Sequence, residues 1–171
     1  QNRVADLVDE DILVFSDANS MYEPNAISEL VSRFVPEVGC VVGELRYRES
    51  SDVEGESVYW RYESWIKRLE SRFYSLVTGN GSIYAVKADS YVPQPADAIS
   101  DFTESLSILR DGERVVYAPG AVAWEETESS TTDELQRRVR IVTRSWNSIV
   151  RFRDLLNPLR NTRIAYELWS H

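Results

Sequence analysis

The triplet Asp17-Ala18-Asn19 directly follows the short apolar run Ile12-Leu13-Val14-Phe15. Such a run predicts a buried strand that ends in a polar loop. The triplet therefore places two oxygen-bearing side chains on one loop, and hard cations such as Mg²⁺ or Mn²⁺ prefer oxygen ligands. Asp and Asn are also common turn and cap residues. From the triplet alone, a metal site and an ordinary turn both stay open.

Two further segments are candidates for a binding or catalytic site: one is rich in glycine and the other contains several acidic side chains. Gly79-Asn80-Gly81 either lets the backbone approach a ligand closely or marks a helix terminus followed by a tight turn. Asp101 stands at the start of a predicted helix, so it can cap that helix or act as a general base in a cleft. Its acidic neighbours, Asp97 and Glu104, are of the kind that raises the pKa of a carboxylate.

A basic segment lies nearer the carboxyl terminus. Arg137, Arg140 and Arg144 are spaced i, i+3 and i+7 and share one face of a predicted helix, with Arg138 about a quarter-turn away. The planar guanidinium group suits phosphate oxygens. A solvated basic face is the simpler explanation for such a run.

Composition excludes several other chemistries. Cys40 is the only cysteine and His171 the only histidine, which excludes most zinc sites and triads that use an internal histidine. Residues 1–133 carry 25 acidic and 11 basic side chains, whereas residues 134–171 carry 3 and 8. The net charge of −9 argues against a general nucleic-acid binder, although the basic carboxyl-terminal part could meet phosphates or an anionic membrane face.

Alternating strand and helix patterns must position these residues. Strands are expected at 12–15, 39–47, 82–86 and 114–117, with a further short one at 122–125. Helices are expected at about 24–34, 56–76, 101–109 and 132–156, followed by an amphipathic segment after Pro158. This order predicts an α/β protein with a mixed sheet and helices on its faces. Ligands of such sheets bind beyond the carboxyl ends of strands, where Asp17 is expected.

Together these motifs resemble those of family 2 glycosyltransferases, and especially membrane-bound enzymes similar to cellulose, hyaluronan and poly-N-acetylglucosamine synthases. The likeness covers nearly the whole chain and is most specific over Val14 to Pro24. It implies a GT-A fold, an α/β/α sandwich. It also implies that residues 1–171 are the carboxyl-terminal two-thirds of a catalytic domain, lacking its amino-terminal nucleotide-binding strands, and that residues 132–171 are helical, basic and membrane-proximal.

The resemblance also implies roles for individual residues. Asp101 matches the base that removes the proton of the acceptor hydroxyl. Asp17 matches a residue that binds metal and diphosphate, and Asn19 stands where many relatives have a second Asp. The segment 137–141 matches the Gln-x-x-Arg-Trp motif of processive synthases, with Arg137 in place of Gln and Ile141 in place of Trp. Arg138 and Arg140 are expected to bind the diphosphate of the donor. The remaining matches are acceptor-binding residues: Gly79, Asn80 and Gly81.

The function expected from this resemblance is inverting transfer of a sugar, with Mg²⁺ or Mn²⁺, from a nucleotide-diphosphate sugar to a carbohydrate or lipid-linked acceptor. Polysaccharide or glycolipid synthesis would then take place at the cytoplasmic face of the cell membrane. Segments outside this chain would attach the protein to that membrane. Nucleic acid is not an expected partner. A noncatalytic regulatory or scaffold module is the alternative, and a plain phosphate-binding α/β protein is another.

Overall fold

The computed structural model describes residues 1–48, 54–95, 98–126, 131–159 and 162–170, and within these it leaves out the side chains of residues 54–60, 131–138 and 170. Asp97 and the side chains of Arg137 and Arg138 therefore lie outside the described part of the chain.

A five-stranded mixed sheet forms the centre of the molecule, with the strand order β1-β4-β3-β5-β2. The strands are β1 (Ile12–Ser16), β2 (Met21–Tyr22), β3 (Val38–Arg48), β4 (Ile83–Lys87) and β5 (Arg114–Glu126). β3 pairs in parallel with β5, and β4 pairs antiparallel with both β1 and β3. Consequently β1, β3 and β5 run in one direction, and their carboxyl ends lie toward one edge of the sheet.

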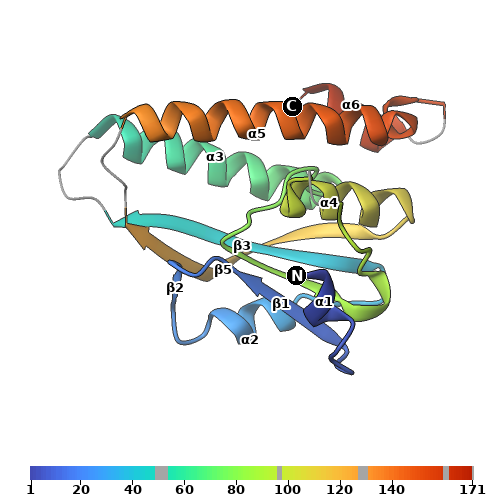
Figure 1. The fold of residues 1–171 in the computed structure, drawn as a ribbon, viewed down its shortest axis with the longest axis horizontal. Coiled ribbons are helices and arrows are strands. Elements are labelled where there is room, and N and C mark those ends of the chain that lie inside the picture. The colour runs from blue at the N-terminus through green and yellow to red at the C-terminus, as the bar shows by residue number, and fades with distance from the viewer. Residues whose placement is uncertain (49–53, 96–97, 127–130, 160–161, 171) are drawn as a thin grey trace.

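Helices cover both faces of this sheet. They are α1 (Asn2–Ala5), α2 (Ala26–Val31), α3 (Glu54–Phe73), α4 (Ser100–Arg110), α5 (Thr131–Arg151) and α6 (Thr162–Ser170), with 3₁₀ segments at Ala88–Ser90 and Arg153–Leu156. In Figure 1, α2 lies on one face, and α3, α4, α5 and α6 are stacked on the other. The predicted α/β/α sandwich with a mixed sheet is thus confirmed. No helix among the described residues combines the length and the apolar character that crossing a membrane requires.

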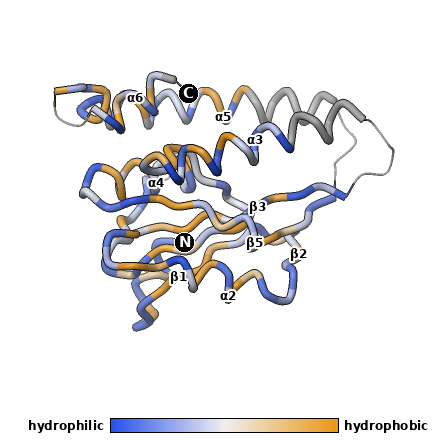
Figure 2. The backbone as a smooth tube through the Cα atoms, turned by 180° about the vertical axis from the view of Figure 1, so that it is seen from behind, coloured by the Kyte–Doolittle hydropathy of each residue, from blue (hydrophilic) through white to orange (hydrophobic). Residues whose placement is uncertain are grey.

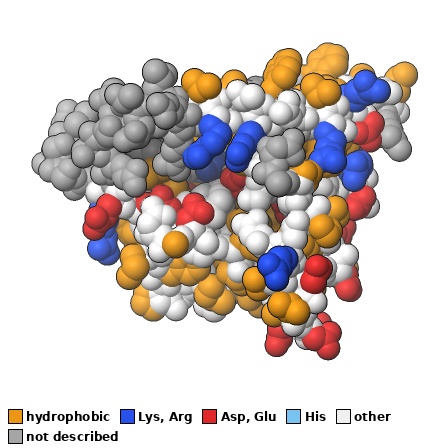
Figure 3. Space-filling model, in the orientation of Figure 1, with side chains coloured by type: hydrophobic (Ala, Val, Ile, Leu, Met, Phe, Trp, Pro, Cys, Tyr) orange, Lys and Arg blue, Asp and Glu red, His pale blue; other side chains and the backbone are white. Residues whose placement is uncertain are grey.

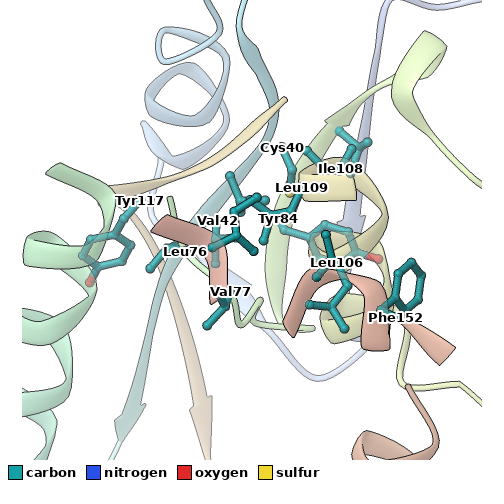
Figure 4. Close-up of a cluster of buried hydrophobic side chains, with 14 residues drawn as sticks. Cys40, Val42, Leu76, Val77, Tyr84, Leu106, Ile108, Leu109, Tyr117 and Phe152 are labelled. Atoms are coloured by element: carbon teal, nitrogen blue, oxygen red, sulfur yellow. The ribbon is translucent and has the colours of Figure 1, made fainter. Parts of the chain in front are cut away.

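Successive side chains of each strand point to opposite faces of the sheet, and they form a hydrophobic core on each face. Val41 and Ala85 pack with Leu30 of α2 on one face. Val42 and Tyr84 pack on the other face with Leu106 of α4, in the cluster that Figure 4 shows in close-up. In Figure 2, runs of hydrophobic residues follow the strands of the sheet. These cores fix the sheet against both helical layers, because buried apolar surface is the main favourable term in folding.

Three local predictions need correction. The two strands expected at 114–117 and 122–125 form a single strand, β5, whose pairing with β3 skips from Ala118 to Val122. Pro119 cannot donate a ladder hydrogen bond, so residues 119–121 bulge and the strand then resumes on the same partner. The helix expected at 24–34 is shorter, because its last turn tightens into bonds such as Phe34 N–H to the Val31 carbonyl. Asp101 is not an N-cap: that position belongs to Ile99.

Candidate functional site

Asp17 lies immediately beyond the carboxyl end of β1, beside the start of the antiparallel strand β4. Ser16 is paired with Ile83, so the loop before β4 arrives at the same edge as the loop after β1. The Ser82 hydroxyl donates to Oδ2 of Asp17 at 3.5 Å. Tyr22 braces this edge, because its hydroxyl lies 3.3 Å from the carbonyl oxygens of both Phe15 and Ser82. Asp17 itself is exposed and available to a ligand.

Asp101 is held in the first turn of α4 by the glycine loop before β4. A Cβ added at Gly79 would lie 2.7 Å from the Asp101 carbonyl oxygen and 3.1 Å from its Cβ. Only glycine therefore allows this backbone contact. The Gly81 N–H donates to the Asp101 carboxylate, and Asn80 shapes the loop by accepting a 3.0 Å bond from the Ser82 N–H through Oδ1. The loop thus fixes the position of Asp101 relative to β4.

Gly81 separates the two carboxylates. A Cβ added there would lie 3.7 Å from Oδ2 of Asp101 and 3.7 Å from Oδ2 of Asp17. These two oxygens are therefore no more than twice that distance apart. Two aspartates that are 84 positions apart in the sequence thus border one small volume of space.

The Asp101 carboxyl has a pKa above its ordinary value. Desolvation by burial is the largest cause, and the nearby negative charge of Asp17 adds to it. Hydrogen bonds from the backbone N–H groups of Phe102, Asp101 and Gly81 oppose the shift, since they stabilise the charged form. A raised pKa makes the ionised carboxylate a stronger base.

Helix α5 closes the site from the side opposite the strands. The Thr103 and Ser148 hydroxyls are buried and lie 2.9 Å apart, which ties α4 to α5. This contact sets the rotation of α5 and brings Arg140, Ile141 and Arg144 to the wall of the cavity.

The cavity between these elements has a volume of about 660 Å³, within the range of small-molecule sites, roughly 300 to 1,000 Å³. The loop after β1, the strand β3, the helices α3 and α5, the loop before β4, and the start of α4 with the two residues before it all contribute to its lining. The lining residues are Asp17, Leu45, Tyr47, Glu63, Lys67, Gly79, Asn80, Gly81, Ser82, Ala98, Ile99, Ser100, Asp101, Arg140, Ile141 and Arg144. In Figure 3, basic side chains over the helical layer face acidic side chains over the sheet across a hollow.

Most of the residues singled out from the sequence meet in this cavity. Those that line it are Asp17, Gly79, Asn80, Gly81, Asp101 and Arg140. Asn19 is exposed and is not part of the lining. The side chain of Arg138 is outside the described residues, so its place relative to the cavity is open.

The sequence-based prediction did not assign several lining residues. Lys67 forms a 2.6 Å ion pair with Glu63, one turn earlier on α3. This i, i+4 pair on a predicted helix was the available signal, although such pairs are usually solvated. Arg144 was expected on the same helix face as Arg140, and the structure places both at the cavity. Nothing in the sequence distinguished Tyr47.

The cavity contains a side chain that could bind a divalent cation. Asp17 offers an exposed carboxylate at the cavity, and Mg²⁺ is usually held through one or two carboxylates together with substrate phosphates and water. Among the described residues there is no cluster of three or more His, Cys, Asp or Glu side chains that could hold a metal by themselves. The donor set therefore fits a cation that the substrate helps to bind.

The sequence matches no protein-family model and no curated protein sequence. The structure, however, is similar to that of the mannosyltransferase PcManGT from Pyrobaculum calidifontis, solved in complex with GDP-Man and Mn²⁺. The TM-score is 0.70 at 18% sequence identity, and the match covers 88% of this chain and 42% of that one. The chain thus spans less than half the length of this neighbour, and it has the fold of a glycosyltransferase.

Proposed function

We propose that this chain is part of the catalytic domain of a nucleotide-sugar-dependent glycosyltransferase of family 2, which transfers a sugar with inversion of the anomeric centre. The main support is that Asp17 and Asp101 present carboxylates to one cavity, separated by Gly81. The neighbour with this fold was solved with a nucleotide sugar and Mn²⁺. Polysaccharide or glycolipid synthesis at the cytoplasmic face of the cell membrane is the proposed role of the whole protein.

Asp101 is the proposed general base. It takes the proton from the acceptor hydroxyl as that oxygen forms a bond to the anomeric carbon and the bond to the diphosphate breaks. Its raised pKa favours proton uptake, and the hydrogen bonds from its own helix turn and from Gly81 fix its direction. Because the attacking oxygen and the leaving diphosphate are on opposite sides of that carbon, the displacement inverts it.

The leaving diphosphate belongs on the Asp17 side of the cavity. Asp17 would hold Mg²⁺ or Mn²⁺, with Asn19 as a second candidate ligand, and the bound cation supplies positive charge that stabilises the departing diphosphate. Arg140 lines the cavity and adds a fixed cation, and Arg138 has the same proposed role. Gly79, Asn80 and Gly81 border the proposed acceptor side while holding Asp101.

Replacing Asp101 by Asn tests this assignment, because it removes the base while keeping the size of the side chain. Turnover of a panel of UDP- and GDP-sugars, including hydrolysis of the donor, should fall by about 10² or more. Donor affinity, measured by calorimetry with Mn²⁺, should change little. Asp111→Asn is the matched control, since Asp111 is exposed at the opposite end of α4 and should leave turnover unchanged.

Turnover of Asp101→Asn within threefold of the unmodified chain would remove Asp101 from the base role. Donor binding without any turnover, even with acceptors supplied, would favour the alternative of a noncatalytic module. A response to nucleotide diphosphates that does not depend on Mn²⁺ would favour a plain phosphate-binding protein instead.

A further inference from the structure

Two arginines that line the cavity are left without a partner in the protein. Arg140 and Arg144 lie about one turn apart on α5, the helix that runs above α3 in Figure 1. Within the part of the chain that the structure describes, neither guanidinium group has an ion pair or a hydrogen bond. The remaining cation of the lining, Lys67, is already paired with Glu63 at 2.6 Å. The cavity therefore presents two unpaired positive charges to a ligand.

The contact between α4 and α5 places these two arginines at different distances from the start of α4. Ser148, one turn beyond Arg144, meets Thr103 at 2.9 Å in the first turn of α4, two residues after Asp101. Arg144 is thus the arginine nearer to the turn that holds Asp101. Arg140 lies about 6 Å farther from that contact along α5, because each residue of a helix adds about 1.5 Å.

The spacing of the two arginines is close to that of the two carboxylates below them. The Oδ2 atoms of Asp17 and Asp101 each lie 3.7 Å from the position of a Cβ at Gly81, so they are at most twice that distance apart. The cavity thus has two ends of similar composition. Arg140 belongs with Asp17 at one end, and Arg144 belongs with Asp101 at the other.

The donor accounts for only one of these ends. In the proposed function, the diphosphate and its cation occupy the Asp17 side, where Arg140 supplies further positive charge. The acceptor hydroxyl must come within hydrogen-bond reach of Asp101. The ligand group closest to Arg144 therefore belongs to the acceptor.

The chemistry of this end favours a negatively charged acceptor. Two N–H groups of a guanidinium can bind two oxygens of one phosphate or carboxylate, and such charge-assisted pairs are stronger than hydrogen bonds between neutral groups. Arg144 would also offset the repulsion between an acceptor anion and the carboxylates of Asp17 and Asp101. A neutral acceptor would use neither property.

We propose that Arg144 binds an anionic group of the acceptor, a phosphate or a carboxylate, while the acceptor hydroxyl faces Asp101. The inference rests on the proposed function, because it takes from it which end of the cavity holds the acceptor. It narrows the acceptor to an anionic class.

Calorimetry with matched pairs of acceptor probes tests the proposal. A uronic-acid disaccharide is compared with its neutral methyl ester, and a monosaccharide 1-phosphate with the free monosaccharide. Each titration is made with a nucleoside diphosphate and Mn²⁺ present in excess, so that the donor side is occupied. At least one charged probe should bind about tenfold more tightly than its neutral counterpart. The pair that shows the difference identifies the source of the anion, a sugar chain or a lipid-linked phosphate.

Substitutions on α5 assign that preference to one residue. Arg144→Gln should abolish the preference for the charged probe, and Arg144→Lys should keep part of it, because the charge remains while the planar fork is lost. Arg140→Gln should weaken binding of the nucleoside diphosphate and leave the preference intact. Arg151→Gln is the matched control, since Arg151 is exposed at the end of α5 and does not line the cavity. It should change neither measurement.

Three results would overturn the proposal. They are equal or undetectable binding of the charged and neutral probes, an unchanged preference in Arg144→Gln, and a loss of nucleoside-diphosphate affinity in Arg144→Gln as large as that in Arg140→Gln. The last would assign Arg144 to the donor. Absence of donor turnover would count against the proposed function instead, because the preference for a charged probe is measured by binding alone.

Discussion

Replacement of Gly79 by Ala should damage the site much more than it damages the fold. The added Cβ would lie 2.7 Å from the carbonyl oxygen of Asp101 and 3.0 Å from its carbonyl carbon. Both are backbone atoms of the first turn of α4, so no flexible side chain can move aside. Either the glycine loop or the start of α4 must shift.

The magnitude follows from the size of that shift. Ordinary van der Waals contacts begin near 3.4 Å, whereas the added Cβ would lie 2.7 Å from the Asp101 carbonyl oxygen. The backbone at residue 79 and the backbone at Asp101 must therefore move apart by the difference between these two distances. Overpacking of this kind costs about 1 to 3 kcal/mol of unfolding free energy. A displacement of about 1 Å in catalytic geometry costs on the order of 10²-fold in rate. The hydrogen bond from Gly81 to the Asp101 carboxylate would also weaken, which should raise the pKa of Asp101 further.

Three measurements check this prediction. Chemical denaturation gives the loss of unfolding free energy, donor turnover gives the loss of rate, and carbon-13 NMR of the aspartate carboxyls follows the Asp101 titration without requiring activity. Gly112→Ala is the control for destabilisation alone, because Gly112 has a φ of +89° at the end of α4. That backbone conformation costs a residue with a Cβ about 1 to 2 kcal/mol, and Gly112 is not among the residues that line the cavity.

Gly81→Ala separates steric conflict from loop flexibility, because its added Cβ would meet nothing closer than 3.7 Å. It should keep stability close to that of the unmodified chain. The reasoning is refuted if Gly79→Ala leaves both the Asp101 titration and the turnover unchanged, or if Gly112→Ala reduces turnover to the same extent.

Two further predictions concern single carboxylates. Asp17→Ala should abolish the Mn²⁺ dependence of donor binding, and calorimetry showing the same affinity with and without Mn²⁺ in both proteins would contradict the metal role. Glu104 is only 1% exposed, and burial raises its pKa from 4.5 to about 7 against the hydrogen bonds from Gln94 and Val92. The folded state therefore holds this proton more tightly, so the stability due to Glu104 is fully present below pH 4.5 and is lost as the pH rises to about 7. Glu104→Gln should remove a pH-dependent contribution of about 3 kcal/mol across that window, and parallel stability–pH curves for the two proteins would exclude it.

The fold class and much of the element order could be predicted from the sequence. Apolar runs at β1 and β4 and helical spacing in α3 carry a periodic signal, because the burial of one face requires it. The short strand β2 and the four-residue helix α1 were not predicted, since two to four residues are too few to show a period. The continuity of β5 was also missed, because Pro119 and Gly120 read as a strand end when the partner strand is unknown.

For the site, the sequence supplied the residue types, and the tertiary structure decided which of them meet. Asp17 was placed correctly beyond a strand end, because one strand and its loop are local features. The contact of Gly79 with the Asp101 backbone and the placement of Lys67 and Arg144 on the cavity depend on antiparallel pairing and on the rotation of α5. Sequence spacing constrains neighbours along the chain, whereas a cavity is formed by residues far apart in it, and only packing of the whole sheet and both helical layers brings those together.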